Sequence, residues 1–214
     1  MNVSVPPAVQ RLLTADVAQE IAKTFTDSPV YPERIVVDTP ASPSRSFPGW
    51  PGAVLVLSYE NQGVCSWGVP LEGGGLRVLV GGDLLDTGHT TMTYTASVED
   101  YIAARRWDFK CLRPPLLIAQ AAELDPASLS YLQARLAPAV ATAGWPGPRQ
   151  YRFEHRDVRV MLWSGSGQCD WWISAADELS LKQFAAGLLD LSNLRQALYS
   201  NDDSGAQVLH DLIG

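Results

Sequence analysis

Two stretches of this chain place a short polar turn between apolar runs that are rich in β-branched and aromatic residues. Residues 53–71 read AVLVLSYENQGVCSWGVPL, and residues 157–175 read DVRVMLWSGSGQCDWWISA. Such runs predict β-strands, and a glycine in the polar segment can take the positive φ that a tight turn requires. We therefore predict one antiparallel β-hairpin in each half of the chain.

The two stretches also match each other when they are aligned without a gap. The identical pairs are Val54 with Val158, Val56 with Val160, Gly63 with Gly167, Cys65 with Cys169, and Trp67 with Trp171. In each hairpin the Cys and the Trp are two residues apart, so both lie on one face of a strand, which we expect to be the core face. The match predicts two related lobes, and a chance likeness between two hydrophobic hairpins is the alternative.

Further elements are expected around the first hairpin. Pro6 and Pro7 suit a helix start, and the Pro-rich segment 38–52 is expected to be an ordered loop or a linker. Two more strands and a helix are expected at residues 76–85, 90–94 and 98–107. Ser97 caps that helix, and its core face holds Val98, Tyr101, Ile102 and Arg105.

The second half repeats the order of helix, strands and helix. An apolar stretch at residues 114–124 precedes a helix that begins at Asp125 and Pro126 and runs to about Val140. Three strands and two helices are expected after it, at residues 149–155, 157–163, 168–174, 179–191 and 206–213. The sequence thus predicts an α+β fold with an antiparallel or mixed sheet flanked by helices, in two lobes over residues 1–110 and 111–214.

Length and charge limit the classes of function. A chain of 214 residues can bury a core without disulfide or metal staples. Its net charge of -7 disfavours binding to nucleic acid and favours a basic protein partner. The N-terminus lacks a basic segment followed by an apolar core, and no run has the length needed to cross a bilayer. We expect a cytoplasmic protein that does not associate with membranes.

The sequence predicts no catalytic residue, no metal site and no cofactor. The three histidines and three cysteines are widely spaced, and "SGSGQ" at residues 164–168 joins two expected strands, which favours a turn over a phosphate loop. Cys65 or Cys169 could serve as a nucleophile only beside a base, and burial on a strand would raise the pKa of either thiol. The acid pairs at residues 99–100, 177–178 and 202–203 lie at helix starts or in polar loops, where capping explains them.

Acidic loops and aromatic residues of the first half are the candidate binding surface. Complementary charge speeds association with a basic partner, and exposed tryptophans such as Trp50, Trp145 and Trp172 often anchor interfaces. The residues that we predict to bind a partner are Trp50, Glu60, Gln62, Glu72, Asp83 and Asp86. The alternative is that acids in loops only keep the domain soluble.

The segment VLSYENQGVCSWGVPLEGGGLRVLVGGDLL, residues 56–85, resembles the SUKH superfamily, the Smi/Knr family of cell-wall assembly regulators and their bacterial relatives. In that family a strand ends in a turn of the E-N-Q-G-V type, and a strand with a central Trp and a further apolar strand follow. The helix SVEDYIAARRW, residues 97–107, is similar to the helix that closes the family's domain. The resemblance covers the first half of the chain.

This resemblance implies an α+β fold and no enzymatic activity. Many bacterial members look like immunity proteins, which bind a toxin from a competing cell and neutralise it. We therefore expect a protein that covers the surface of a toxin, with a basic toxin domain as the partner. A regulatory or scaffold protein that binds a peptide or another cellular protein is the alternative. The oligomeric state stays open.

Overall fold

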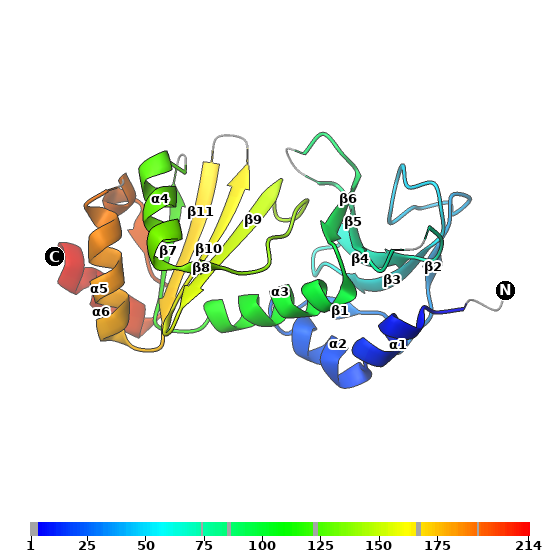
Figure 1. The fold of residues 1–214 in the computed structure, drawn as a ribbon, viewed down its shortest axis with the longest axis horizontal. Coiled ribbons are helices and arrows are strands. Elements are labelled where there is room, and N and C mark those ends of the chain that lie inside the picture. Colours follow the sequence, from blue (N-terminus) through cyan, green and yellow to red (C-terminus); the bar gives the residue numbers. More distant parts are fainter. Residues whose placement is uncertain (1–3, 74, 85–86, 122–123, 166–167, 192) are drawn as a thin grey trace. The chain divides into compact units, whose positions relative to one another are not determined.

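The computed structural model describes residues 4–73, 75–84, 87–121, 124–165, 168–191 and 193–214. The chain forms two compact units, which we call unit 1 (Met1–Trp107 with Thr142–Pro148) and unit 2 (Asp108–Ala141 with Arg149–Gly214). Within the described ranges it has six α-helices and two antiparallel sheets of six strands each. Figure 1 shows this α+β fold, with helices beside each sheet. The predicted fold class is therefore confirmed.

Unit 1 combines one sheet with helices at both ends of its sequence. In chain order its elements are α1 (Pro7–Leu12), α2 (Ala15–Ala22), β1 (Ser28–Pro29), β2 (Val37–Asp38), β3 (Val54–Tyr59), β4 (Cys65–Pro70), β5 (Val78–Gly82), β6 (Thr91–Thr95) and α3 (Val98–Cys111). The strand order is β1-β3-β4-β5-β6, and β2 also pairs with β3. The predicted hairpin and the strands after it form this antiparallel meander. The boundary between the units lies inside α3, as does the boundary expected at residues 110 and 111.

Both faces of the unit 1 sheet are covered, which explains the near-continuous apolar run in β3. One face packs against the helices, where Leu57 and Trp67 join Ile21 and Tyr101 in a single buried cluster. Cys65 belongs to the same cluster, so the expected core face of the hairpin is confirmed.

The Pro-rich segment covers the other face of this sheet and is an ordered loop. Phe47 is fully buried there against Val54, Val56 and Leu79. The Asp38 carboxylate accepts a hydrogen bond of 3.2 Å from the Phe47 backbone N–H. The loop approaches the sheet closely at Gly81, where only glycine fits, because a Cβ atom at this position would lie 2.3 Å from the Ser46 carbonyl oxygen.

Unit 2 builds its sheet from more distant segments. Its elements after α3 are β7 (Leu116–Ala121), α4 (Pro126–Arg135), β8 (Ala137–Pro138), β9 (Arg149–His155), β10 (Val158–Gly165), β11 (Gln168–Ala175), α5 (Glu178–Leu189), a short 3₁₀ helix (Asn193–Gln196), β12 (Leu198–Tyr199) and α6 (Asp203–Ile213). The strand order is β12-β7-β11-β10-β9-β8. Helices α4, α5 and α6 lie along one face of this sheet (Figure 1), where Leu132, Leu181 and Val208 pack against Trp171 and Leu162.

The opposite face of the unit 2 sheet holds a buried ion pair. Arg152 on β9 donates two hydrogen bonds to the Asp108 carboxylate, from Nε at 2.5 Å and from Nη2 at 2.8 Å. Its Nη1 donates a third to the Val140 carbonyl oxygen at 3.0 Å. Both charged side chains are almost fully buried. Removing either partner of such a pair would strongly destabilise the fold, because the other charge would stay buried and uncompensated.

Several helix boundaries differ from the prediction: α6 begins at Asp203 instead of Ala206, α5 ends at Leu189 instead of Leu191, and the ends of α3 and α4 differ more. Helix α3 continues to Cys111 instead of ending near Trp107. Helix α4 ends at Arg135 instead of near Val140, because Leu136 is extended and the next two residues pair with β9 as β8. Pro138 explains this early end, since proline cannot continue a helix and disfavours the helical conformation of the residue before it.

The two predicted hairpins share their geometry but not their neighbours. Hairpin β3–β4 and hairpin β10–β11 are both antiparallel, and Trp67 and Trp171 are each buried. However, β4 pairs next with β5, which follows it in the chain, whereas β11 pairs with β7, which precedes it. A common origin of the two halves stays a prediction.

Candidate functional site

The side chain of Glu60 stabilises the turn between β3 and β4 through hydrogen bonds to its backbone. Its Oε2 accepts hydrogen bonds from the backbone N–H groups of Gln62, at 2.7 Å, and of Val64, at 3.3 Å. Gly63 has a φ of 76° and donates its N–H to the Glu60 carbonyl at 2.9 Å. Glu60 is buried, while Asn61, Gln62 and Gly63 are exposed.

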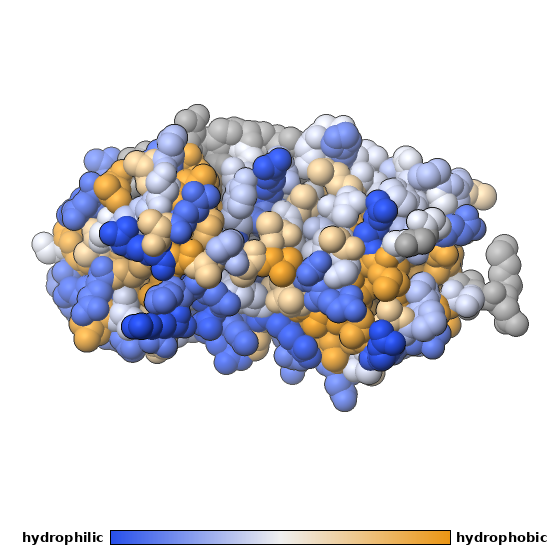
Figure 2. Space-filling model, in the orientation of Figure 1, coloured by the Kyte–Doolittle hydropathy of each residue, from blue (hydrophilic) through white to orange (hydrophobic). Residues whose placement is uncertain are grey.

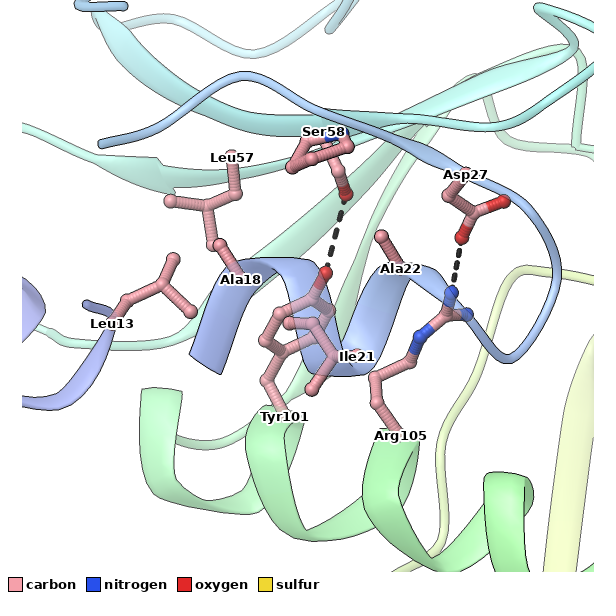
Figure 3. A pocket seen from close by; sticks show the side chains of 10 residues that line it. Leu13, Ala18, Ile21, Ala22, Asp27, Leu57, Ser58, Tyr101 and Arg105 are labelled. Atoms are coloured by element: carbon pink, nitrogen blue, oxygen red, sulfur yellow. Dashed lines mark hydrogen bonds and ion pairs between the residues drawn. The ribbon is translucent and has the colours of Figure 1, made fainter. Parts of the chain in front are cut away.

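Beside this turn lies a second carboxylate, paired with an arginine from α3. The Arg105 Nη2 donates a hydrogen bond to Asp27 Oδ2, and both side chains are almost fully buried (Figure 3). The guanidinium carbon also lies 4.9 Å from the ring centroids of Phe25 and of Trp67. Aromatic faces attract a cation at this distance, so two kinds of contact hold Arg105 in place.

The charges of this region do not balance. Asp27 and Glu60 bring two carboxylates, and Arg105 brings one positive charge. Burial raises the pKa of Asp27, and Glu60 acts in the same direction, while Arg105 opposes them. Burial first, and then the charges of Glu60 and Asp27, also raise the pKa of the Cys65 thiol. The cluster thus holds two carboxyl groups beside one guanidinium, and Cys65 stays a protonated thiol.

The cavity beside this cluster is too small for a substrate. Its volume is about 10 Å³, which matches a single water molecule. Ser58 and Tyr101 line it, and their hydroxyl groups lie 3.2 Å apart (Figure 3). Burial raises the pKa of Tyr101 to about 12, so its phenol stays neutral. This cavity belongs to the packing of the unit.

Three of the predicted binding residues, Glu60, Gln62 and Asp83, share one end of the unit 1 sheet, but Glu60 is buried there and only the other two are exposed. Gln62 is exposed at the tip of the β3–β4 turn, and Asp83 is exposed in the next connection at the same end. The Asp83 N–H donates to the Val64 carbonyl at 3.1 Å, which joins the two connections. We call Asn61, Gln62, Gly63 and Asp83, together with the buried Asp27 and Glu60 beneath them, the acidic turn surface.

The other predicted binding residues lie elsewhere. Glu72 is exposed, but it follows β4 at the opposite end of the sheet. Trp50 is half-buried and packs on the cluster around Phe47, and Trp145 and Trp172 are half-buried as well. Asp86 lies outside the described residues. The predicted set therefore does not form one continuous surface.

Asp27 was not among the residues predicted from the sequence. A signal was present, because Arg105 stands on the otherwise apolar face of the helix expected over residues 98–107. A guanidinium on a core face needs a buried acceptor. The pattern could not say which acid supplies it, since Asp27 and Arg105 are far apart in the chain.

All three thiols are free and buried. Burial raises the pKa of Cys111 and of Cys169 to about 12. The acids that open helices act as caps: the Asp177 and Asp202 carboxylates accept hydrogen bonds from the N–H groups of Ser180 and Gly205. Across the described part of the chain, no three His, Cys, Asp or Glu residues are grouped so that they could hold a metal ion.

Exposed hydrophobic side chains are scattered over the chain. The large ones among the described residues are Ile35, Leu179, Leu191, Tyr199 and Ile213. On the face that Figure 2 shows, hydrophobic areas are separated by hydrophilic side chains. In unit 2, Tyr199 and Ile213 border an open groove of about 410 Å³ beside α6.

Within the described residues, no helix combines the length and the apolar character that crossing a membrane requires. No family model, curated protein or solved structure matches this chain.

Proposed function

We propose that this chain is a non-catalytic protein-binding domain of the immunity type, which neutralises a toxin by covering its surface. The observation that carries the proposal is the acidic turn surface. It places exposed polar groups over two fixed carboxylates, Asp27, which is paired with Arg105, and Glu60, which is bonded to the turn backbone. The turn belongs to the segment that resembles the SUKH superfamily.

The fixed geometry of this surface suits recognition of a basic protein. Because Glu60 is tied to the turn and Asp27 to Arg105, these charges need no rearrangement when a partner arrives. Asp83 adds an exposed carboxylate, and the Gln62 amide can both donate and accept hydrogen bonds. Charge complementarity of this kind raises association rates and selects among partners.

The state of the thiols supports a role without covalent catalysis. A nucleophilic cysteine needs a lowered pKa and access to a substrate, whereas burial raises the pKa of all three thiols here. Free thiols also suit the reducing cytoplasm, where we place the protein and its partner.

Co-expression tests the proposal. The wild-type chain and its variants would be produced in cells together with the product of a toxin-like gene that neighbours the gene for this chain. We expect the wild type to protect the cells and the double variant Gln62→Lys/Asp83→Lys to lose protection. Glu72→Lys is the matched control, because it adds positive charge at an exposed site on the opposite end of the sheet.

Failure of the wild-type chain to protect cells or to form a complex would overturn the proposal. The second candidate is a regulatory or scaffold protein that uses the same surface for a cellular protein or peptide. The gene neighbourhood separates the two, since an immunity gene lies beside a toxin gene and a scaffold gene need not.

A further inference from the structure

The open groove of unit 2 is bordered by the last helix and by the edge strand of the sheet. Its volume is about 410 Å³, and its lining includes Leu209 and Ile213 on α6 and Tyr199 on β12. Tyr199 is 39% exposed and Ile213 is 40% exposed, so two large exposed hydrophobic side chains meet at one groove. All of its lining residues belong to unit 2, so a single compact unit forms it.

Strand β12 also offers unpaired backbone groups. Among the described strands it pairs with β7 alone and ends the sheet. Tyr199 lies opposite Ile118, and Leu116, two residues before Ile118, forms backbone hydrogen bonds to side chains that follow β12. Alternate residues of a strand direct their backbone groups to the same side, so Ile118 bonds to Tyr199. The N–H and C=O of Leu198 therefore point away from β7, and an edge of this kind can pair with a strand of another chain.

Opposite charges flank this edge strand. Arg195 lies in the short 3₁₀ helix before β12, and Asp203 is the first residue of α6 after it. Both residues are exposed, and neither forms an ion pair with another described residue. A strand with a basic residue before it and an acidic residue after it is complementary to an antiparallel copy of itself.

We propose that two copies of this chain form a symmetric dimer in which their β12 strands pair antiparallel, centred on Tyr199. This pairing brings the Arg195 segment of each copy to the Asp203 segment of the other, so that two equivalent ion pairs form. It also brings the two grooves together and removes the exposed surface of Tyr199 and Ile213 from water. The sheets of the two copies then join into one continuous sheet.

A second copy suits this surface better than a basic peptide does. A basic ligand would be attracted by Asp203 and repelled by Arg195, whereas a second copy satisfies both charges. The net charge of -7 opposes the association of two copies. Physiological salt, however, screens this repulsion beyond about 8 Å, while ion pairs in direct contact keep part of their attraction.

The dimer does not involve the acidic turn surface, so this inference and the proposed function can fail separately. The test is sedimentation velocity of the full chain from about 1 to about 100 μM, where we expect the dimer fraction to rise with concentration. Tyr199→Asp should weaken dimerisation at least about tenfold, because it places a charge at the centre of the interface. Ile35→Asp is the matched control, since it makes the same change at a side chain of unit 1 that is 58% exposed, and it should leave dimerisation unchanged.

Charge reversal tests the orientation of the two copies. Arg195→Asp and Asp203→Arg should each weaken dimerisation at least about tenfold, because like charges then meet at both contacts. A mixture of the two variants should dimerise again, since each variant supplies the charges that the other needs. A variant with a misfolded unit 2 could not be rescued by mixing. A wild-type chain that stays monomeric throughout would overturn the proposal and leave the groove to another kind of partner, and a mixture that stays monomeric would overturn it as well.

Discussion

Arg105 and Arg106 are consecutive on α3, but the ion pair of Arg105 is buried and that of Arg106 is exposed. Arg105 is buried and paired with the buried Asp27. Arg106 forms an ion pair of 2.7 Å with Glu20, and both of these side chains are more than two-fifths exposed. Water and salt screen the second pair but not the first. The two pairs therefore offer a matched comparison on one helix.

We predict that Asp27→Asn lowers the free energy of unfolding by about 3 kcal/mol, because it removes the carboxylate that is paired with the buried Arg105 guanidinium. Glu20→Gln should lower it by less than about 1 kcal/mol, since its partner stays in water. Urea denaturation of both variants measures the difference. Equal effects would show that burial does not set the value of the Asp27 pair.

The thiols give a prediction about pH. Burial raises the pKa of Cys111 and Cys169 to about 12 and that of Cys65 further still. Deprotonation is therefore shifted to higher pH in the folded state, and the reactive thiolate is scarce near pH 8. We expect a disulfide reagent such as DTNB to label no cysteine of the native protein at that pH, and all three in denaturant. Rapid labelling of a native thiol would contradict the non-catalytic account.

Among the structural elements, the Pro-rich segment shows how a loop can complete a core. Four prolines prevent regular structure between residues 38 and 52, but Phe47 still docks on the sheet. The close approach depends on glycine, because a Cβ at Gly81 would also lie 2.7 Å from the Phe47 ring. The loop and the strand are therefore matched to each other.

Gly81→Ala should destabilise unit 1 by about 1 to 3 kcal/mol, since the added methyl group collides with the Ser46 backbone and the Phe47 ring. Gly52→Ala lies in the same segment and is the control, because its Cβ would meet Trp50 at an ordinary distance of 3.7 Å. Thermal unfolding compares the two. A Gly81→Ala protein as stable as the control would mean that the segment is not closely packed.

Elements with strong local patterns could be predicted from the sequence. The apolar, β-branched and aromatic residues around Val56 and Trp67 have the pattern of strands, and strands form there. Ser97 and Asp125 cap helices at the predicted starts. The strands β1, β2, β8 and β12 have two residues each, which is too short for any periodicity. Pairings such as β12 with β7 depend on contacts between distant segments, which a local pattern does not encode.

The candidate site was predictable only in part. Gln62 and Asp83 were identified as exposed polar residues of loops, and the structure brings them to one end of a sheet. Glu60 was identified too, but its backbone hydrogen bonds and its burial arise from the turn conformation, which composition does not reveal. Asp27 was missed because its partner is brought near only by folding.

At the scale of the whole molecule, the described residues form two compact units, and each unit contains a six-stranded antiparallel sheet and a buried Arg–Asp pair. Each also buries a Cys and a Trp two residues apart on a central strand. The units differ in how the chain reaches the strand beside that hairpin. A similar hairpin with different neighbouring strands is compatible with a diverged duplication and with two units of independent origin.

Calorimetric titration of the purified chain with the product of a neighbouring toxin-like gene tests the central claim most directly. We predict that the wild type and Glu72→Lys bind with the same affinity, and that Gln62→Lys/Asp83→Lys binds at least about tenfold more weakly, because it replaces the exposed carboxylate of the acidic turn surface with two positive charges. No binding by the wild type, or equal binding by the double variant, would contradict the account.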